Sequence, residues 1–250
     1  MTNRLWKRWE IPPVKGFGEE LSLKELRISP LTAQVLFNRG ISTADQARRF
    51  LSPALSDLPN PLAMKDMEKA VGRISAAIRD REKITIFGDY DVDRTTATAL
   101  LLRFLQGAGA RVDFYLPQRL KEGYGLNIDA VKKIQAQGTK LIITTDCGIS
   151  NNEEIRWAME NGLDVVVTDH HEVPEVLPAA LAILNPKQKD CPYPFKGLAG
   201  VGVAFNLLIA LRSALRQEGF FPPGQEPNLK GYLDLVCLLY TSDAADEEDS

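Results

Sequence analysis

Five short apolar runs alternate with helical stretches between residues 84 and 184, and this alternation constrains the fold of the chain more than any other feature. The runs are ITIF (84–87), VDFYL (112–116), LIITT (141–145), VVVT (165–168) and LAIL (181–184). Strands that are apolar throughout and are joined by helices pair in parallel and are covered on both faces. The sequence therefore predicts an α/β fold with a doubly wound, five-stranded parallel sheet.

The chain before these runs is expected to form an N-terminal helical segment. Ser29 and Ser42 are candidate N-caps of two short helices that end near Gly40 and Pro53. A Pro-rich connector, LSPALSDLPNPLAM, follows at residues 51–64. We therefore assign residues 1–65 to the helical segment and connector, and residues 66–236 to the α/β domain.

Composition excludes several classes of protein. At 250 residues and 44% hydrophobic, the chain can bury a full core. No apolar run approaches the roughly 18 to 20 residues of a membrane span, and the start lacks the apolar stretch of a secretory signal. We therefore expect a cytoplasmic protein without a membrane partner. The three cysteines form no CxxC pair, which argues against a zinc ribbon or a disulfide framework.

Charged residues directly follow three of the five predicted strands. They are Asp89, Asp91 and Asp93 after the first strand, Asp146 after the third, and Asp169, His170 and His171 after the fourth. Open parallel sheets bind ligands beyond the carboxyl ends of their strands, near a switch in strand order. If the second strand lies outside the first, and the third lies on its other side, the three tips are neighbours and their side chains converge.

Converging carboxylates need a cation, because they raise one another's pKa and otherwise tend to stay protonated. A single aspartate after a strand is more often a cap or a turn residue, so the cluster is what favours a metal site. Carboxylates with imidazole nitrogens suit Mn²⁺, Fe²⁺ or Zn²⁺ better than Ca²⁺. A shared carboxylate can bridge two ions about 3.5 to 4 Å apart, which activate water and hold a phosphoryl group. The tips therefore predict one wall of a two-metal phosphoesterase site.

Four ordered motifs then carry a resemblance to a known family. GDYDVD, TTDCGIS, the DHH of VTDHHEVPEV, and GLAGVGVAF together resemble the DHH phosphoesterase superfamily and, within it, the RecJ family of single-strand-specific exonucleases. The resemblance runs from about residue 30 to residue 236 and includes RLKEGYGL at residues 119–126. It identifies residues 66–236 as a DHH phosphoesterase catalytic domain.

The resemblance implies roles for the residues at the strand tips. It implies that Mn²⁺ or Mg²⁺, as two ions, is held by Asp91, Asp93, Asp146 and His170, with Asp146 as the bridge. Asp93, Asp146 and His171 are then the catalytic residues, and His171 assists at the scissile phosphate. Capping and support of the ligands are both open for Asp89 and Asp169.

Two further segments are candidates for substrate binding. In RLKEGYGL, Arg119 could hold a phosphate and Tyr124 could stack on a base, although a solvated loop is the default for such a segment. In GLAGVGVAF, the amides of Gly200 and Gly202 could face a phosphate. Close packing of a helix against the sheet accounts for these glycines equally well.

The family resemblance implies degradation of single-stranded DNA from the 5′ end, in recombination and repair, with a helicase or a single-strand-binding protein as partner. One alternative is another DHH phosphodiesterase that acts on short oligonucleotides, cyclic dinucleotides or pyrophosphate. The N-terminal helical segment and RLKEGYGL argue against that alternative. A second is a non-catalytic RecJ-related scaffold, which would normally have lost the acids and histidines that this chain retains.

The sequence departs from the family pattern at two places. Arg94 stands where the resemblance implies glycine, and an arginine there is expected to displace Asp93 or to compete with a metal ion beside it. Residues 237–250 form an acidic tail with five Asp or Glu and no Lys or Arg. This tail resembles nothing in the family, whose pattern continues into a further aspartate ligand, and we expect it not to be native. We therefore expect the chain to fold but to have weak or no activity.

Overall fold

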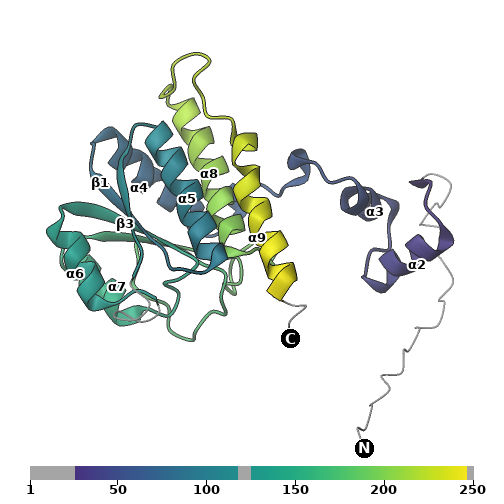
Figure 1. Cartoon of the computed structure of the whole chain (residues 1–250), viewed down its shortest axis with the longest axis horizontal. Coiled ribbons are helices and arrows are strands. Elements are labelled where there is room, and N and C mark those ends of the chain that lie inside the picture. Colours follow the sequence, from purple (N-terminus) through teal and green to yellow (C-terminus); the bar gives the residue numbers. More distant parts are fainter. Residues whose placement is uncertain (1–25, 118–124, 247–250) are drawn as a thin grey trace, which may run out of the picture. The chain divides into compact units, whose positions relative to one another are not determined.

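The structure of the protein is a computed structural model that describes residues 26–117 and 125–246. The chain forms two compact units, Met1–Leu58 and Pro59–Ser250 (Figure 1). The second unit begins before residue 66, where the sequence placed the domain boundary, because the 3-10 turn η2 (Pro61–Ala63) and the buried Met64 belong to its core.

The first unit contains α2 (Pro30–Asn38), α3 (Ala44–Leu51) and the 3-10 turn η1 (Leu55–Asp57). Ser29 caps α2 as predicted, and its hydroxyl accepts a hydrogen bond from the Thr32 amide at 3.1 Å. The prediction of Ser42 as the cap of α3 was wrong. Thr43 caps this helix, because it forms a reciprocal capping box with Gln46, three residues later.

The second unit is built on one five-stranded parallel sheet. Its strands are β1 (Lys83–Phe87), β2 (Arg111–Tyr115), β3 (Thr139–Thr145), β4 (Asp164–Thr168) and β5 (Ala182–Leu184). They pair in the order β2-β1-β3-β4-β5, and every pairing is parallel. The predicted fold class and the predicted placement of the second and third strands on either side of the first are confirmed. Consequently β1, β3 and β4, whose tips carry the charged residues, are neighbours.

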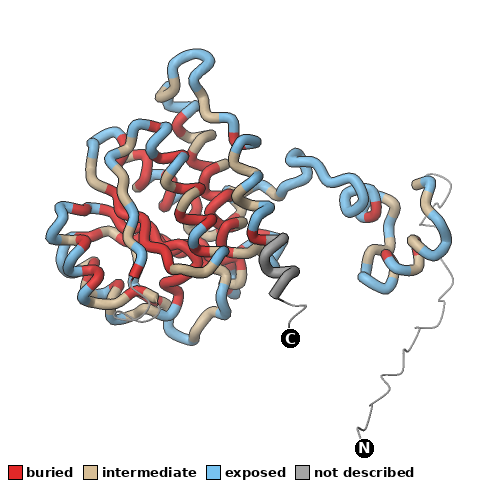
Figure 2. Tube along the Cα trace, in the orientation of Figure 1, coloured by how far each residue is buried: buried red, intermediate tan, exposed pale blue. Residues whose placement is uncertain are grey.

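Helices cover both faces of the sheet. One core contains residues of α4 (Met67–Arg79), α5 (Val92–Gly107), α8 (Gly200–Gln217) and α9 (Leu233–Asp246), and the other contains residues of α6 (Ile128–Ala136) and α7 (Asn152–Glu160). The pleat separates neighbouring side chains, because Leu141 and Ile143 of β3 lie in the first core and Ile142 lies in the second. Figure 2 shows the buried strands between these two layers.

The C-terminal part of this unit contains the 3-10 turn η3 (Leu229–Tyr232) and α9. The backbone of α9 runs across residue 237, where the sequence placed the start of the acidic tail, and Leu239 is buried in the first core. Within residues 26–117 and 125–246, no helix has the length and apolar character needed to cross a membrane.

Candidate metal centre at the carboxyl edge of the sheet

Asp146 is the central residue of the site. It directly follows β3, and its amide donates to the carbonyl of Thr168 at 2.8 Å, which ties it to the end of β4. Its φ is +54°, in the left-handed region that non-glycine residues seldom adopt. Such strained conformations cluster at functional sites, where the surrounding structure enforces them.

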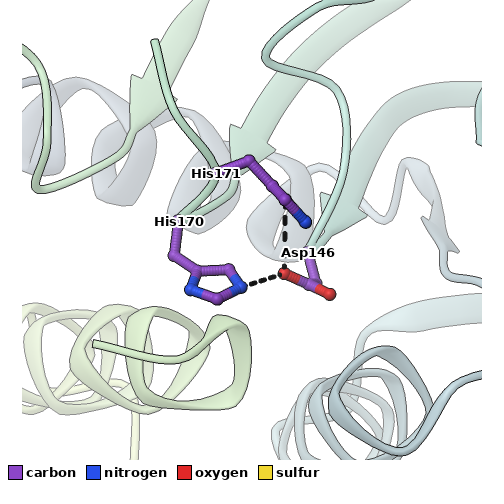
Figure 3. Close-up of side chains that lie close together, drawn as sticks. All are labelled: Asp146, His170 and His171. Carbon is purple, nitrogen blue, oxygen red and sulfur yellow. Dashed lines mark ion pairs between the residues drawn. The ribbon is translucent and has the colours of Figure 1, made fainter. Parts of the chain in front are cut away.

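Both histidines turn toward Asp146 (Figure 3). Asp146 Oδ1 lies 2.9 Å from His170 Nε2 and 3.7 Å from His171 Nδ1. One ligand atom from each of these residues lies within 4.8 Å of the other two. Asp93 joins the group from α5, because its Oδ2 lies 3.7 Å from His170 Nε2. The tips of β1, β3 and β4 therefore converge as the strand order requires.

The N-terminus of α8 holds Asp93. The amide of Gly200 donates to Asp93 Oδ2 at 2.7 Å, and the amide of Val201 donates to Oδ1 at 2.6 Å. A helix N-terminus stabilises a carboxylate through its unpaired N–H groups and its dipole. Burial and the neighbouring charge of Asp146 outweigh these two bonds and raise the pKa of Asp93 to about 6.

Gly200 explains how α8 comes this close. A Cβ on Gly200 would lie 2.5 Å from Asp146 Cβ and 2.7 Å from Asp146 Oδ1, so only glycine fits. At Gly202 a Cβ would meet Leu198 Cδ2 at 3.2 Å, which is a movable side chain. Gly200 is therefore required by the site, and its amide already donates a hydrogen bond to Asp93.

Asp169 positions the two histidines. Its Oδ1 accepts the amides of His170 and His171 at 2.7 and 3.0 Å and lies 2.7 Å from the ring Nδ1 of His171. Its Oδ2 accepts the amide of Ile149 at 3.0 Å. Burial works to raise the pKa of Asp169, but the bonds from His171 and Ile149 outweigh it, so the pKa is lowered. The carboxylate therefore stays charged and fixes the orientation of the His171 ring. This contact is made by Nδ1 and not by Nε2 of the ring.

The buried Asn185 was missed by the sequence reasoning. It follows β5, is fully buried, and donates through Nδ2 to the carbonyl of His171 at 3.0 Å. The signal was available, because a polar residue at the carboxyl end of a strand beside the fourth strand lies next to the two histidines.

Arg94 lies within the acid cluster. Its Nη1 lies 3.1 Å from Asp89 Oδ2 and 3.2 Å from Asp91 Oδ2. Its Nε donates to the carbonyl of Asp146 at 2.8 Å and lies 3.3 Å from Asp146 Oδ2. The Arg94 guanidinium thus pairs with Asp89, Asp91 and Asp146, while the amides of Gly200 and Val201 hold Asp93. Competition of Arg94 with a metal ion stays a prediction.

The remaining two aspartates of the first tip have structural partners. Asp91 is the N-cap of α5, and its Oδ1 accepts the amide of Arg94 at 2.8 Å. Asp89 is fully buried and accepts the amides of Tyr90 at 2.8 Å and Gly125 at 3.1 Å. The carboxylates therefore fall into two groups that share Asp146: Asp93 with the histidines, and Asp89 and Asp91 with Arg94.

The charge states of the site follow from these contacts. The hydrogen-bond contact with Asp146 raises the pKa of His170, and the one with Asp169 raises the pKa of His171. Burial acts to lower the pKa of the Arg94 guanidinium, but the negative charges around it, Asp91 first, raise it above its usual value. The Arg94 guanidinium therefore lies on one side of Asp146 and the two imidazoles on the other.

The donor set fits a divalent cation. Asp146 Oδ1 is buried, and its described contacts are His170 Nε2 at 2.9 Å and His171 Nδ1 at 3.7 Å. A buried carboxylate needs a compensating positive charge, which a divalent cation can supply. Two carboxylates and an imidazole are ligands that suit Mn²⁺ and similar ions. The predicted substrate residues Arg119 and Tyr124 lie outside the described residues.

Comparison with known proteins shows the family of the chain. The family model for the N-terminal domain of the DHH family matches residues 83–238 of the chain. The chain belongs to the DHH family. Its first, third and fourth strands with their charged tips all lie inside the matched range of this DHH domain.

Relatives with the same architecture carry the RecJ name. The single-stranded-DNA-specific exonuclease RecJ of Bacillus subtilis (strain 168) is 48% identical over 211 residues, which are 84% of this chain and 27% of that protein. The crystal structure of RecJ in complex with Mn²⁺ from Thermus thermophilus superposes with a TM-score of 0.66 and 32% identity over 86% of this chain and 28% of that one. The corresponding complex with Mg²⁺ gives a TM-score of 0.51 and 27% identity over 86% of this chain and 25% of that one. The DHH chain thus spans about a quarter of the length of these proteins.

Proposed function

We propose that this DHH domain hydrolyses phosphodiester bonds in a metal-dependent reaction and degrades single-stranded DNA from the 5′ end. The observation that carries the proposal is the meeting of Asp93, Asp146 and His170, whose side chains converge at the buried Asp146 Oδ1. The similarity to proteins named single-stranded-DNA-specific exonuclease RecJ supports the substrate class and a role in recombination and repair.

The residues offer two places for a cation on either side of Asp146. Asp93 Oδ2, Asp146 Oδ1 and His170 Nε2 would hold Mn²⁺ or Mg²⁺ at the first place. Asp89, Asp91 and Asp146 Oδ2 surround the second place, so Asp146 is the shared carboxylate. A bound divalent cation supplies Lewis-acid activation of water and neutralises charge on the phosphoryl group.

His171 is the residue we assign to the scissile phosphate. Its ring is half exposed, and Asp169 holds Nδ1, so Nε2 remains for the substrate. The raised pKa of His171 favours the protonated ring, which donates a hydrogen bond to a phosphate oxygen or a proton to the leaving oxygen. Asp169 is a positioning residue in this arrangement, because it acts through His171.

The proposal also assigns three residues to contacts with the substrate. Because the Gly200 amide serves Asp93, Gly202 is the glycine of the α8 N-terminus that we assign to a phosphate oxygen, with Arg119 for a phosphate and Tyr124 for stacking on a base. A site that relies on stacking and backbone contacts accepts any base sequence but rejects a duplex. We further propose action in the cytoplasm, with a helicase or a single-strand-binding protein that supplies single strands.

The test is Mn²⁺-dependent release of nucleotides from end-labelled single-stranded DNA, with blunt duplex, a dinucleotide and pyrophosphate as competing substrates. We expect slow digestion of the single strand only. His171→Asn should abolish turnover and retain Mn²⁺ binding, whereas Arg73→Gln, whose guanidinium pairs with Asp164 and Glu82 away from the site, should match the wild type. Hydrolysis of the dinucleotide or pyrophosphate alone would identify another DHH phosphodiesterase, and Mn²⁺ binding without any hydrolysis would identify a scaffold.

A further inference from the structure

The guanidinium of Arg94 occupies the space between three carboxylates. Its side chain is 8% exposed, and its nitrogens lie 3.1 to 3.3 Å from Asp89, Asp91 and Asp146. A guanidinium is permanently charged, planar and a donor only, so it binds several carboxylates at once without a metal. The second cation place of the site is therefore filled by the chain itself.

The carboxylates around Arg94 have few lone pairs left for a metal ion. Asp89 already accepts the amides of Tyr90 and Gly125, and Asp91 accepts the amide of Arg94 as the cap of α5. Expelling the guanidinium would leave the fully buried Asp89 without a cation. A buried charge that loses its partner strongly destabilises the fold. The same carboxylates that would attract an ion therefore hold the guanidinium in place.

The opposite side of Asp146 is different. Asp146 Oδ1 is buried and lies 2.9 Å from His170 Nε2, an imidazole nitrogen of the kind that binds metal ions. Asp93 Oδ2 lies 3.7 Å from the same nitrogen, and α8 fixes this carboxylate through two amides. The two oxygens of one carboxylate thus have different environments: Oδ2 is paired with a guanidinium, which cannot bind a metal ion, and Oδ1 with an imidazole, which can.

We propose that the Arg94 guanidinium takes the place of the second cation, so that the site binds a single divalent ion, at Asp93, Asp146 Oδ1 and His170. This inference rests on the proposed metal-dependent function and specifies how many divalent ions the site binds. Arg94 is a positioning residue here, because it orients Asp146 and neutralises Asp89 and Asp91.

The experiment counts Mn²⁺ ions bound to the whole chain after removal of metals with a chelator. Isothermal titration and the Mn²⁺ electron paramagnetic resonance (EPR) signal are recorded for the wild type, Arg94→Gln, Arg94→Lys and Arg73→Gln. Arg73 is the matched control, because it is a partly buried arginine that pairs with two carboxylates, Asp164 and Glu82. Circular dichroism verifies that each variant is folded.

We expect the wild type, Arg94→Lys and Arg73→Gln to bind one Mn²⁺ each, and Arg94→Gln to bind two. The second ion of Arg94→Gln should bind at least tenfold more tightly than any second ion of the wild type. The resonance spectrum of Arg94→Gln should also show the coupling of two neighbouring ions. Two coupled ions in the wild type, or one ion in folded Arg94→Gln, would overturn the inference and leave the proposed function standing. The wild-type count decides the matter even if Arg94→Gln does not fold. Absence of Mn²⁺ binding by every variant would instead remove the proposed metal-dependent function.

Discussion

Replacing Gly200 with alanine should disrupt the site although it adds only one methyl group. The new Cβ would lie 2.5 Å from Asp146 Cβ, 2.7 Å from Oδ1 and 2.8 Å from Cγ, so either Asp146 or α8 has to move. Asp146 has little freedom, because its backbone has a φ of +54° and its amide is bonded to Thr168. We therefore expect α8 to move and the amides of Gly200 and Val201 to leave Asp93.

The size of the effect follows from these contacts. Overpacking a close contact costs about 1 to 3 kcal/mol, and a hydrogen bond to a charged group contributes about 1.5 to 3 kcal/mol. The gain in helix propensity from glycine to alanine offsets at most about 1 kcal/mol. Because movement of α8 relieves the overlap but breaks both bonds, which together contribute about 3 to 6 kcal/mol, the free energy of unfolding should fall by about 2 to 5 kcal/mol after the propensity offset. Mn²⁺ affinity should fall about 10- to 100-fold, as it does when groups that orient metal ligands are lost.

Gly202→Ala is the matched control, because it also replaces a glycine of α8 with alanine, two positions after Gly200. Its Cβ would meet only Leu198 Cδ2 at 3.2 Å, and this side chain can rotate away. The free energy of unfolding should stay within about 1 kcal/mol of the wild type. Urea denaturation followed by circular dichroism, and Mn²⁺ titration, compare the two variants. Equal stability and equal Mn²⁺ affinity of Gly200→Ala and Gly202→Ala would refute the close-approach argument.

Three further predictions concern the carboxylates. Mn²⁺ should bind more tightly than Ca²⁺, because an imidazole nitrogen is among the ligands, and equal affinities in titration would contradict the ligand set. Asp146→Ala should weaken Mn²⁺ binding more than Asp89→Ala, since Asp146 belongs to both groups of carboxylates, and the reverse order would show that the shared ligand is misassigned. The pKa of Asp93 is about 6 in the folded state, against 3.8 in the unfolded state. With metal removed by a chelator, protonation of Asp93 should therefore stabilise the wild type relative to Asp93→Asn as the pH falls from about 6 to 4, by up to about 3 kcal/mol. A difference in unfolding free energy that does not change with pH would exclude the raised pKa.

The sheet could be predicted from the sequence because its information is local. Each strand is a continuous apolar run, and parallel pairing brings strand ends to one edge, so the meeting of Asp93, Asp146 and His170 follows from strand order alone. The supports of the site could not be predicted in this way. Glycines before a helix suit a bound phosphate as well as a close approach to Asp146. The orientation of the Arg94 side chain depends on the positions of three carboxylates in the folded protein.

The bonds between Asp93 and α8 join residues that are 107 and 108 positions apart in the chain. All the acids and both histidines of the site precede residue 172, yet the ligand Asp93 is fixed only when α8, which begins at Gly200, has docked. During synthesis, therefore, the nascent chain contains these ligands before α8 is available to arrange them. A nick between residues 195 and 199 would leave these ligands intact while loosening their geometry, so we expect it to weaken metal binding without changing any ligand.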